Sequence, residues 1–131
     1  METREIRIVY GERELYLPID NILLVKAEGN YCDVYMNNSV FNLRSPLGKF
    51  WVEIETQGKD YPHHLKRISR SYIINLDYLT KVDPIEGSIT LYKPDSPILN
   101  KISSMPNNEL KVNVGKMPTK ELVKFLDKNK E

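Results

Sequence analysis

The side chains best suited to chemistry in this chain form one basic stretch. Lys66, Arg67 and Arg70 lie close together, and no acidic residue interrupts the sequence between Asp60 and Asp77. Lysine and arginine side chains bind phosphate, and the arginine fork can also pair with the edge of a guanine base. On charge alone, a solvated surface strand or loop is the simpler explanation of the same cluster. Charge alone therefore leaves both an anionic partner and a plain surface open.

Catalytic chemistry finds little support in the sequence. There is no dinucleotide-binding or phosphate-binding glycine loop and no zinc-protease helix motif. His63 and His64 are adjacent, so on a strand they point to opposite faces and chelate one metal poorly. Cys32 has no histidine at a spacing that suggests a nucleophile pair, and Glu53 and Glu55 do not face each other on a helix. We expect no enzyme, no metal and no cofactor.

Length and composition fit one globular domain of 131 residues. Lys and Arg total 19 against 18 Asp and Glu, which gives a net charge of +1. The single cysteine, Cys32, excludes an internal disulfide and fits a reducing compartment. No apolar run is long enough for a membrane span, and the charged Met1–Glu5 start is unlike a signal peptide. We therefore expect a cytoplasmic protein with no membrane contact.

The near-neutral total hides an asymmetry along the chain. Residues 1–60 hold seven basic and ten acidic residues, whereas the remainder holds twelve basic and eight acidic ones. A domain with so little net charge does not coat nucleic acid by bulk charge, but a local basic face remains compatible with binding.

Most of the sequence has the two-residue alternation of β-strands. Gly11–Glu12 separates two such runs and predicts a hairpin. The continuous apolar run Ile22–Val25 predicts a buried strand, and Ala27–Asn30 predicts the turn after it. Leu76–Val82 fits either a strand or a short helical turn. The predicted strands cover residues 4–10, 14–19, 22–25, 31–36, 40–43, 72–74, 89–92 and 110–114.

Two helices complete the prediction. Ser45 is expected as the N-cap and Pro46 as the first helical residue, before a helix of about three turns that ends near Gly58. Its apolar positions have helical spacing and are Leu47, Phe50, Trp51 and Ile54. Pro118 opens a C-terminal helix, and residues 94–108 read as a loop. Short turns join the strands, so the fold expected is mainly β, with antiparallel sheet, a mid-chain helix and a C-terminal helix.

Two stretches of the sequence carry a recognisable pattern. Ile22–Tyr35 resembles the strand–turn–strand "I-L-Y-I-E-A-x-G-N-Y" of the LytTR DNA-binding domain family, which occurs in LytR/AlgR-type bacterial transcriptional regulators. Leu65–Leu76 resembles the "F-x-R-I-H-R-S-Y-I-V-N" signature of the same family. A weaker third match is Val112–Lys116, which is similar to the family's "I-P-V-S-R" strand end. The resemblance covers about residues 3–128, and we interpret 1–131 as a single domain.

The resemblance implies an elongated β-rich domain whose loops contact double-stranded DNA in successive major grooves of direct-repeat promoter sites. By position, Arg70 and Lys116 are the implied base contacts, and Asn30, Tyr31 and Cys32 lie at one groove. The phosphate contacts expected beside Arg70 are Lys66, Arg67, Ser69 and Ser71. The alternative to a DNA contact for Arg70 is a surface ion pair with Asp77. Many relatives follow a receiver domain, so a receiver or sensor partner in trans and a homodimer on DNA are also compatible.

The chain departs from the family pattern at three places. Ser69 replaces the usual His, Gly115–Lys116 replaces Ser-Arg, and the loop at 94–108 is long enough to be an insertion. No receiver domain precedes the motifs, so we expect a free-standing regulator or an excised domain. The function expected is sequence-specific DNA binding in transcription regulation. The alternative is a protein-interaction module on the same fold that has lost DNA recognition.

Overall fold

The computed structural model describes residues 5–10, 12–36, 39–60, 64–92 and 109–113. The strands are β1 (Glu5–Tyr10), β2 (Arg13–Pro18), β3 (Ile22–Glu28), β4 (Tyr31–Met36), β5 (Val40–Leu43), β6 (Leu65–Arg67), β7 (Tyr72–Asn75), β8 (Leu79–Asp83), β9 (Ser88–Tyr92) and β10 (Glu109–Asn113). The helices are α1 (Leu47–Gln57) and the short 3-10 turns η1 (Ile19–Asn21), η2 (Gly58–Asp60) and η3 (Leu76–Tyr78).

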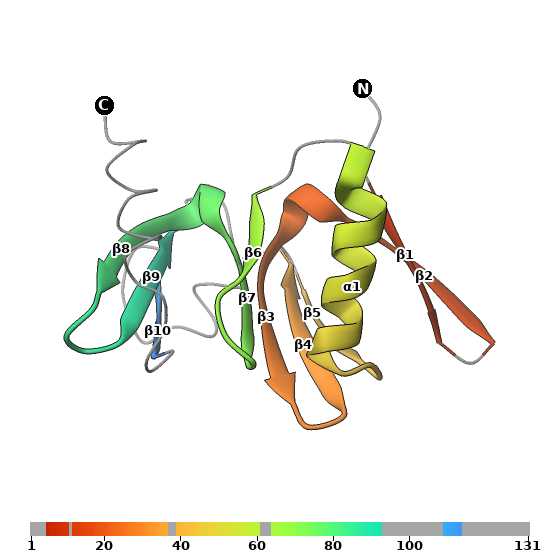
Figure 1. The fold of residues 1–131 in the computed structure, drawn as a ribbon, viewed down its shortest axis with the longest axis horizontal. Coiled ribbons are helices and arrows are strands. Elements are labelled where there is room, and N and C mark those ends of the chain that lie inside the picture. Colours follow the sequence, from red (N-terminus) through yellow and green to blue (C-terminus); the bar gives the residue numbers. More distant parts are fainter. Residues whose placement is uncertain (1–4, 11, 37–38, 61–63, 93–108, 114–131) are drawn as a thin grey trace.

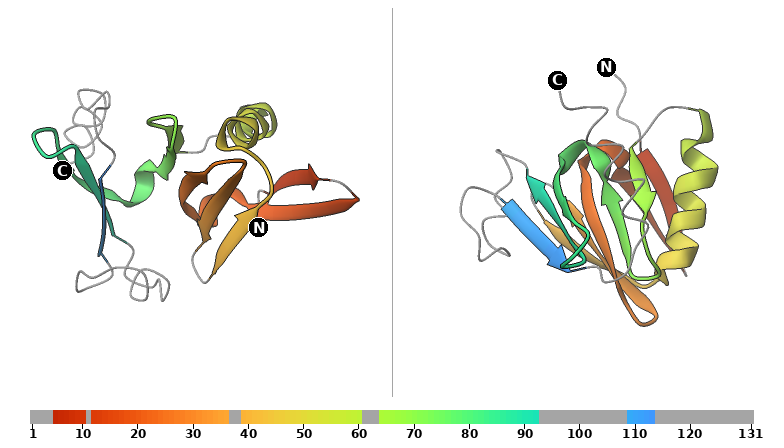
Figure 2. Two further views of the ribbon diagram at one scale, coloured as in Figure 1. Left: turned by 90° about the horizontal axis from the view of Figure 1, so that it is seen from below. Right: turned by 60° about the vertical axis from the view of Figure 1, so that its left-hand side comes forward.

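The strands form three antiparallel sheets that stand in a row along the long axis of the molecule (Figures 1 and 2). The β1–β2 hairpin lies at one side, and the sheet β10-β9-β8 lies at the other. Between them stands the five-stranded central sheet, in the order β5-β4-β3-β7-β6. The mainly β, antiparallel prediction is confirmed.

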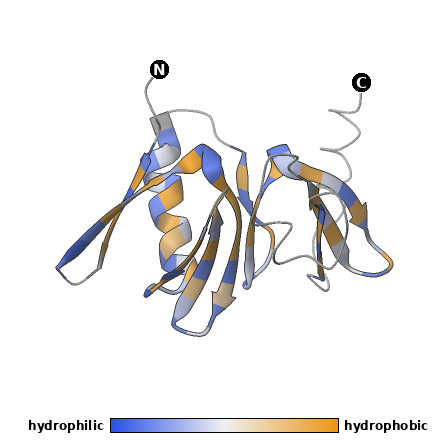
Figure 3. Ribbon diagram, turned by 180° about the vertical axis from the view of Figure 1, so that it is seen from behind, coloured by the Kyte–Doolittle hydropathy of each residue, from blue (hydrophilic) through white to orange (hydrophobic). Residues whose placement is uncertain are grey.

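The central sheet is covered on both faces, which explains the continuous apolar run at the start of β3. On one face, α1 and the β1–β2 hairpin cover the sheet. Phe50 of α1 and Ile8 of β1 belong to the same buried cluster as Val25, Val34 and Ile73. Figure 3 shows apolar residues on α1 and on the central strands, where they alternate with hydrophilic ones. This side forms the first hydrophobic core.

The second core lies between the opposite face of the central sheet and the sheet β10-β9-β8. Leu24 and Ile74 of the central sheet pack there with Ile89 and Leu91 of β9 and Val112 of β10. Ile22 and Val25 enter the first core, whereas Leu23 and Leu24 both enter the second, because the strand register shifts between Ile22 and Leu24. Neither face of β3 needs a polar side chain between Ile22 and Val25, and all four residues are buried.

Most sequence predictions agree with these elements. The hairpin and the strands at 31–36 and 40–43 are confirmed, and Cys32, Val34 and Met36 share the buried face of β4. The ambiguous segment Leu76–Val82 contains both alternatives, since the turn η3 is followed by β8. The sequence reasoning did not assign β6, a strand of three residues.

The predicted start of the mid-chain helix is wrong by one residue. Pro46, not Ser45, occupies the N-cap position, and it provides no side-chain cap. Ser45 is instead buried and tied to the preceding turn, because its backbone N–H donates to the carbonyl of Leu43 at 2.8 Å. The C-terminal helix predicted from Pro118 and the loop predicted at 94–108 lie outside the described residues.

Candidate nucleic-acid interface

The β3–β4 turn lies at one end of the central sheet, the lower end in Figure 1. Gly29 has a φ of 66°, a left-handed conformation that an L side chain adopts only with strain. This glycine allows the chain to reverse over two residues. It leaves Asn30 exposed and Tyr31 42% exposed at the start of β4.

The β6–β7 turn lies beside it and is internally ordered. The N–H of Ile68 donates to the carbonyl of Tyr72 at 3.0 Å, and the N–H of Ser71 donates to Ser69 Oγ at 3.1 Å. The side chain of Ile68 is buried in the second core. The buried side chain of Ile68 therefore holds the turn against the second core, while Ser71 and Arg70 are exposed at its tip.

A backbone hydrogen bond joins the β6–β7 turn to β3, two residues before Gly29 of the β3–β4 turn. The N–H of Ala27 donates to the carbonyl of Ser71 at 2.8 Å, one step beyond the paired residues Lys26 and Tyr72 of β3 and β7. Residues 28–31 and 69–71 consequently reach the same end of the sheet, as Figure 1 shows. The structure thus brings together two of the three segments that the sequence predicted as DNA contacts.

Arg70 has an exposed side chain that can meet a ligand. Within the residues that the structure describes, it forms neither an ion pair nor a hydrogen bond. The alternative ion pair between Arg70 and Asp77 does not form, because Asp77 pairs with Nδ1 of His64. Its guanidinium can therefore bind an anion or a base edge without first breaking an internal contact.

Arg67 is placed differently from its neighbour Arg70. It is half-buried, and its Nε donates to the carbonyl of Ser69 at 3.1 Å. Its guanidinium also lies over the first turn of α1, 3.4 Å from the point where a Cβ on Gly48 would stand. Arg67 thus connects the start of α1 to the turn that presents Arg70.

Cys32 is fully buried and faces the first core. Burial, together with the nearby Asp33 carboxylate, raises the pKa of its thiol to about 11. Its side chain is therefore neutral at physiological pH and out of reach of a DNA surface. Any role at the groove predicted for residues 30–32 falls to Asn30 and Tyr31.

Two acidic residues share this part of the central sheet, but both have partners. Glu28 Oε1 lies 3.4 Å from Nζ of Lys26. Asp33 Oδ1 accepts a hydrogen bond of 3.0 Å from Nδ2 of Asn42. These contacts reduce, without removing, the repulsion that the two carboxylates exert on an approaching phosphate.

Sequence reasoning missed two cations at this end of the molecule and one buried amide at the other end of β7. Arg44 precedes α1 and Lys49 lies in its first turn, both exposed, and they bring further positive charge to the end where the helix begins. Asn75 is buried at the end of β7 that lies away from the β6–β7 turn, where Nδ2 donates to the carbonyl of Ile22 at 2.9 Å. Asn75 lies inside the second motif, Leu65–Leu76, so the family resemblance was the signal that could have identified it.

The remaining predicted contact, Lys116, lies outside the described residues. The chain leaves β10 at Asn113, and Figure 2 shows that this end of the strand points to the same end of the molecule as the two turns. Across the described ranges, no helix has the length and hydropathy needed to cross a bilayer, and no three metal-ligating side chains gather.

Comparisons with known proteins agree with the fold. The family model of the LytTr DNA-binding domain (LytTR) matches residues 12–101, more than half of the chain. A solved structure described as the LytTr DNA-binding domain of a methyl-accepting/DNA response regulator from Bacillus cereus superposes with a TM-score of 0.53. It is 14% identical, and the match covers 93% of this chain and 95% of that one. A comparison with curated proteins found no match. The chain belongs to the LytTR family of DNA-binding domains.

Proposed function

We propose that this domain binds DNA sequence-specifically, with the β3–β4 and β6–β7 turns entering the major groove. The observation that carries the proposal is the juxtaposition of the two turns, with Arg70 exposed and unpaired among the described residues. In the major groove an arginine donates two hydrogen bonds to O6 and N7 of guanine, which distinguishes that base from the other three. We assign this base contact to Arg70.

The other residues of the two turns have supporting roles. Asn30 offers both a donor and an acceptor at the tip of the β3–β4 turn, with Tyr31 beside it. Ser69, Ser71 and Lys66 suit phosphate contacts, which set the position of the domain on the duplex and carry no sequence information. Arg67 was predicted as a further phosphate contact, but its hydrogen bond to Ser69 supports a positioning role for the β6–β7 turn.

The proposal is tested by fluorescence anisotropy with a DNA fragment selected from a genomic or random pool. Arg70→Ala should weaken binding to the selected site by about 1–3 kcal/mol, or roughly 5- to 150-fold, and relax the preference at one base position. Lys59→Ala is the matched control, because Lys59 is an exposed cation in η2, beyond the opposite end of α1. It should leave the affinity within about twofold.

Two outcomes would contradict the base-reading role. An equal loss of affinity on every DNA sequence would make Arg70 a phosphate contact. Equal effects of Arg70→Ala and Lys59→Ala would mean that only net charge matters. Repeating the titration between about 50 and 200 mM salt gives the number of phosphate contacts from the slope, and no binding at low salt would overturn the function itself.

Several finer expectations remain predictions. They are the direct-repeat promoter sites, Lys116 as a base contact, a receiver or sensor partner in trans, a homodimer on DNA and a cytoplasmic location. The alternative function, an interaction module without DNA recognition, gains no support from the family match.

A further inference from the structure

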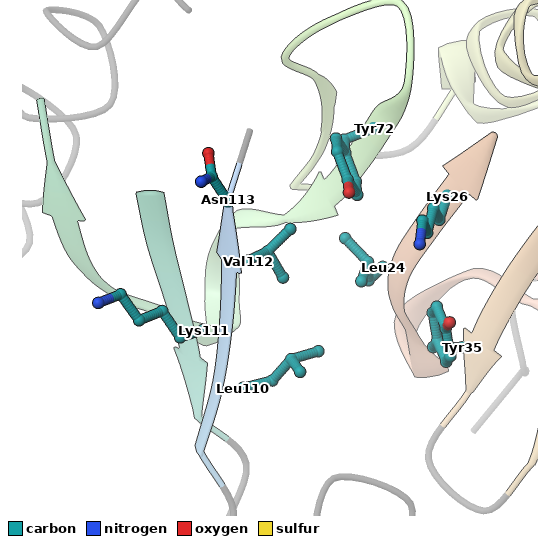
Figure 4. A pocket seen from close by; sticks show the side chains of 8 residues that line it. All are labelled: Leu24, Lys26, Tyr35, Tyr72, Leu110, Lys111, Val112 and Asn113. Atoms are coloured by element: carbon teal, nitrogen blue, oxygen red, sulfur yellow. The ribbon is translucent and has the colours of Figure 1, made fainter. Parts of the chain in front are cut away.

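A groove of about 270 Å³ runs between β10 and the central sheet (Figure 4). Leu24 and Lys26 of β3, Tyr35 of β4 and Tyr72 of β7 form one wall, and residues 110–113 of β10 form the other. None of the predicted DNA-contact residues lines it. The groove therefore offers a second place at which a ligand can bind.

The groove has both polar and apolar side chains in its lining, and its apolar part is formed by Leu24, Leu110 and Val112. Leu110 and Val112 point across the groove toward Leu24, because alternate residues of β10 face the central sheet (Figure 4). Pockets for drug-sized molecules usually measure about 300–1,000 Å³. A space of 270 Å³ with aliphatic side chains in its lining instead suits a planar molecule of one or two rings.

One end of the groove is polar and has a single cation. Lys26 and the phenols of Tyr35 and Tyr72 lie close enough to interact electrostatically, and the pKa of Lys26 is raised, first by Tyr72 and then by Glu28. Burial, followed by the effect of Asp33, raises the pKa of Tyr35, which keeps that phenol a neutral hydrogen-bond donor. Two hydroxyl donors and one ammonium group thus flank the apolar part of the groove.

The ion pair that Lys26 already makes does not prevent this use. Its partner Glu28 is 3.4 Å away, and both side chains are more than 40% exposed. Exposed ion pairs contribute little free energy, so a better placed carboxylate can compete with Glu28. Lys111 does not add a second charge to the groove, because its Nζ pairs with Glu86 at 2.7 Å and points away in Figure 4.

We propose that this groove binds a small aromatic monocarboxylate, with its ring between Leu24 and the apolar residues of β10 and its carboxylate on Lys26, Tyr35 and Tyr72. A single ammonium group matches a single negative charge. The apolar part of the lining favours a ring over a fully polar anion such as inorganic phosphate.

Such a ligand would also influence DNA binding, a consequence that rests on the proposed function. Tyr72 directly follows Ser71, and Lys26 directly precedes Ala27, the two residues whose backbone hydrogen bond joins the β6–β7 turn to β3. A ligand that moves either side chain therefore acts one residue from that bond. Occupancy of the groove is expected to change the affinity for DNA, because the ligand would bind the DNA-free and the DNA-bound domain with different affinities.

The test is a titration of the ¹⁵N-labelled full chain with indole-3-acetate, followed by NMR, with neutral indole-3-acetamide as the matched ligand. The acid should cause saturable shifts at Leu24, Lys26, Tyr72 and Val112 and bind about five- to tenfold more tightly than the amide. Lys26→Met should abolish that preference. Lys111→Met, which removes a lysine from the same groove lining, should keep it.

Three results would overturn the proposal: no saturable shifts below about 10 mM ligand, equal affinity for acid and amide, or a preference that survives in Lys26→Met. Tyr72→Phe provides a second variant if Lys26→Met does not fold, and it should reduce the preference for the acid. DNA titrations on the same samples without ligand separate the two claims. Intact DNA binding with no ligand response would contradict the groove alone, and the reverse result would contradict the proposed function alone.

Discussion

Asn75 gives the sharpest test of how the fold holds β7, the strand that follows the β6–β7 turn, in the central sheet. Its side chain is 2% exposed, and its two ends serve different partners. Nδ2 donates to the carbonyl of Ile22 at 2.9 Å, which ties β7 to the start of β3, and Oδ1 accepts from the N–H of Asp77 at 3.0 Å, which caps η3. Asn75→Ala removes both bonds.

The two losses differ in size. Ile22 is fully buried, so the hydrogen bond lost by its carbonyl costs about 1–3 kcal/mol, because water cannot replace the amide. The N–H of Asp77 belongs to an exposed residue, and its loss costs about 0.5–1 kcal/mol. The free energy of unfolding should therefore fall by about 2–4 kcal/mol, a large share of the ~5–15 kcal/mol typical of a domain.

Urea unfolding followed by circular dichroism measures this change. With a slope of about 1–3 kcal/mol per M, the midpoint should drop by about 0.7–4 M. Asn42→Ala is the matched control, since the exposed Asn42 donates only to the Asp33 carboxylate and its loss should cost under about 0.5 kcal/mol. A midpoint shift for Asn75→Ala no larger than that of Asn42→Ala would refute the reasoning.

Three further predictions concern the core, the turn and the buried thiol. Ile54→Ala should lower the free energy of unfolding by about 2–5 kcal/mol in the same urea assay. Val52 is 55% exposed on the same helix, so Val52→Ala should cost far less. Similar losses for the two variants would contradict the packing of α1. Gly29→Ala introduces a side chain at a φ of 66° with no atom within 4 Å, so backbone strain and not a clash should lower the free energy of unfolding by about 1–2 kcal/mol. The strain should also displace Asn30 and weaken DNA binding in the anisotropy assay. Unchanged stability and affinity would argue against a tight turn. The pKa of Cys32 is raised to about 11, so the thiol is protonated at pH 8 and should react with a thiol reagent only after unfolding; rapid labelling of the native protein would contradict its burial.

The periodicity of the sequence was enough to place most of the described strands. The pattern of β4 is the clearest case, because alternate residues enter a single core and leave a strict two-residue signal. The run Ile22–Val25 was also read as buried, but only the structure shows the two cores that cover its two faces. The strand β6 was missed because three residues are too few for alternation to be visible.

The candidate site was predicted less completely, for reasons that lie in tertiary contacts. The sequence predicted Arg70 as a base contact and Arg67 as a phosphate contact, yet Arg67 is held by Ser69 over α1 and only Arg70 is exposed. That difference arises because Arg67 ends β6 beside Gly48, whereas Arg70 lies at the tip of the β6–β7 turn, and a basic cluster in the sequence reveals neither position. Cys32 likewise falls within the first motif, although its position on β4 turns its side chain into the core.

The central claim is that the β3–β4 and β6–β7 turns together form the DNA-contacting surface. The most direct measurement is an NMR titration of the ¹⁵N-labelled chain with its selected DNA duplex, with every shifted amide mapped onto the sequence. Among the described residues, the largest shifts should fall at residues 28–31 and 69–71, with weak effects in η2. Shifts concentrated in the β1–β2 hairpin or in η2, with the two turns unchanged, would contradict the claim.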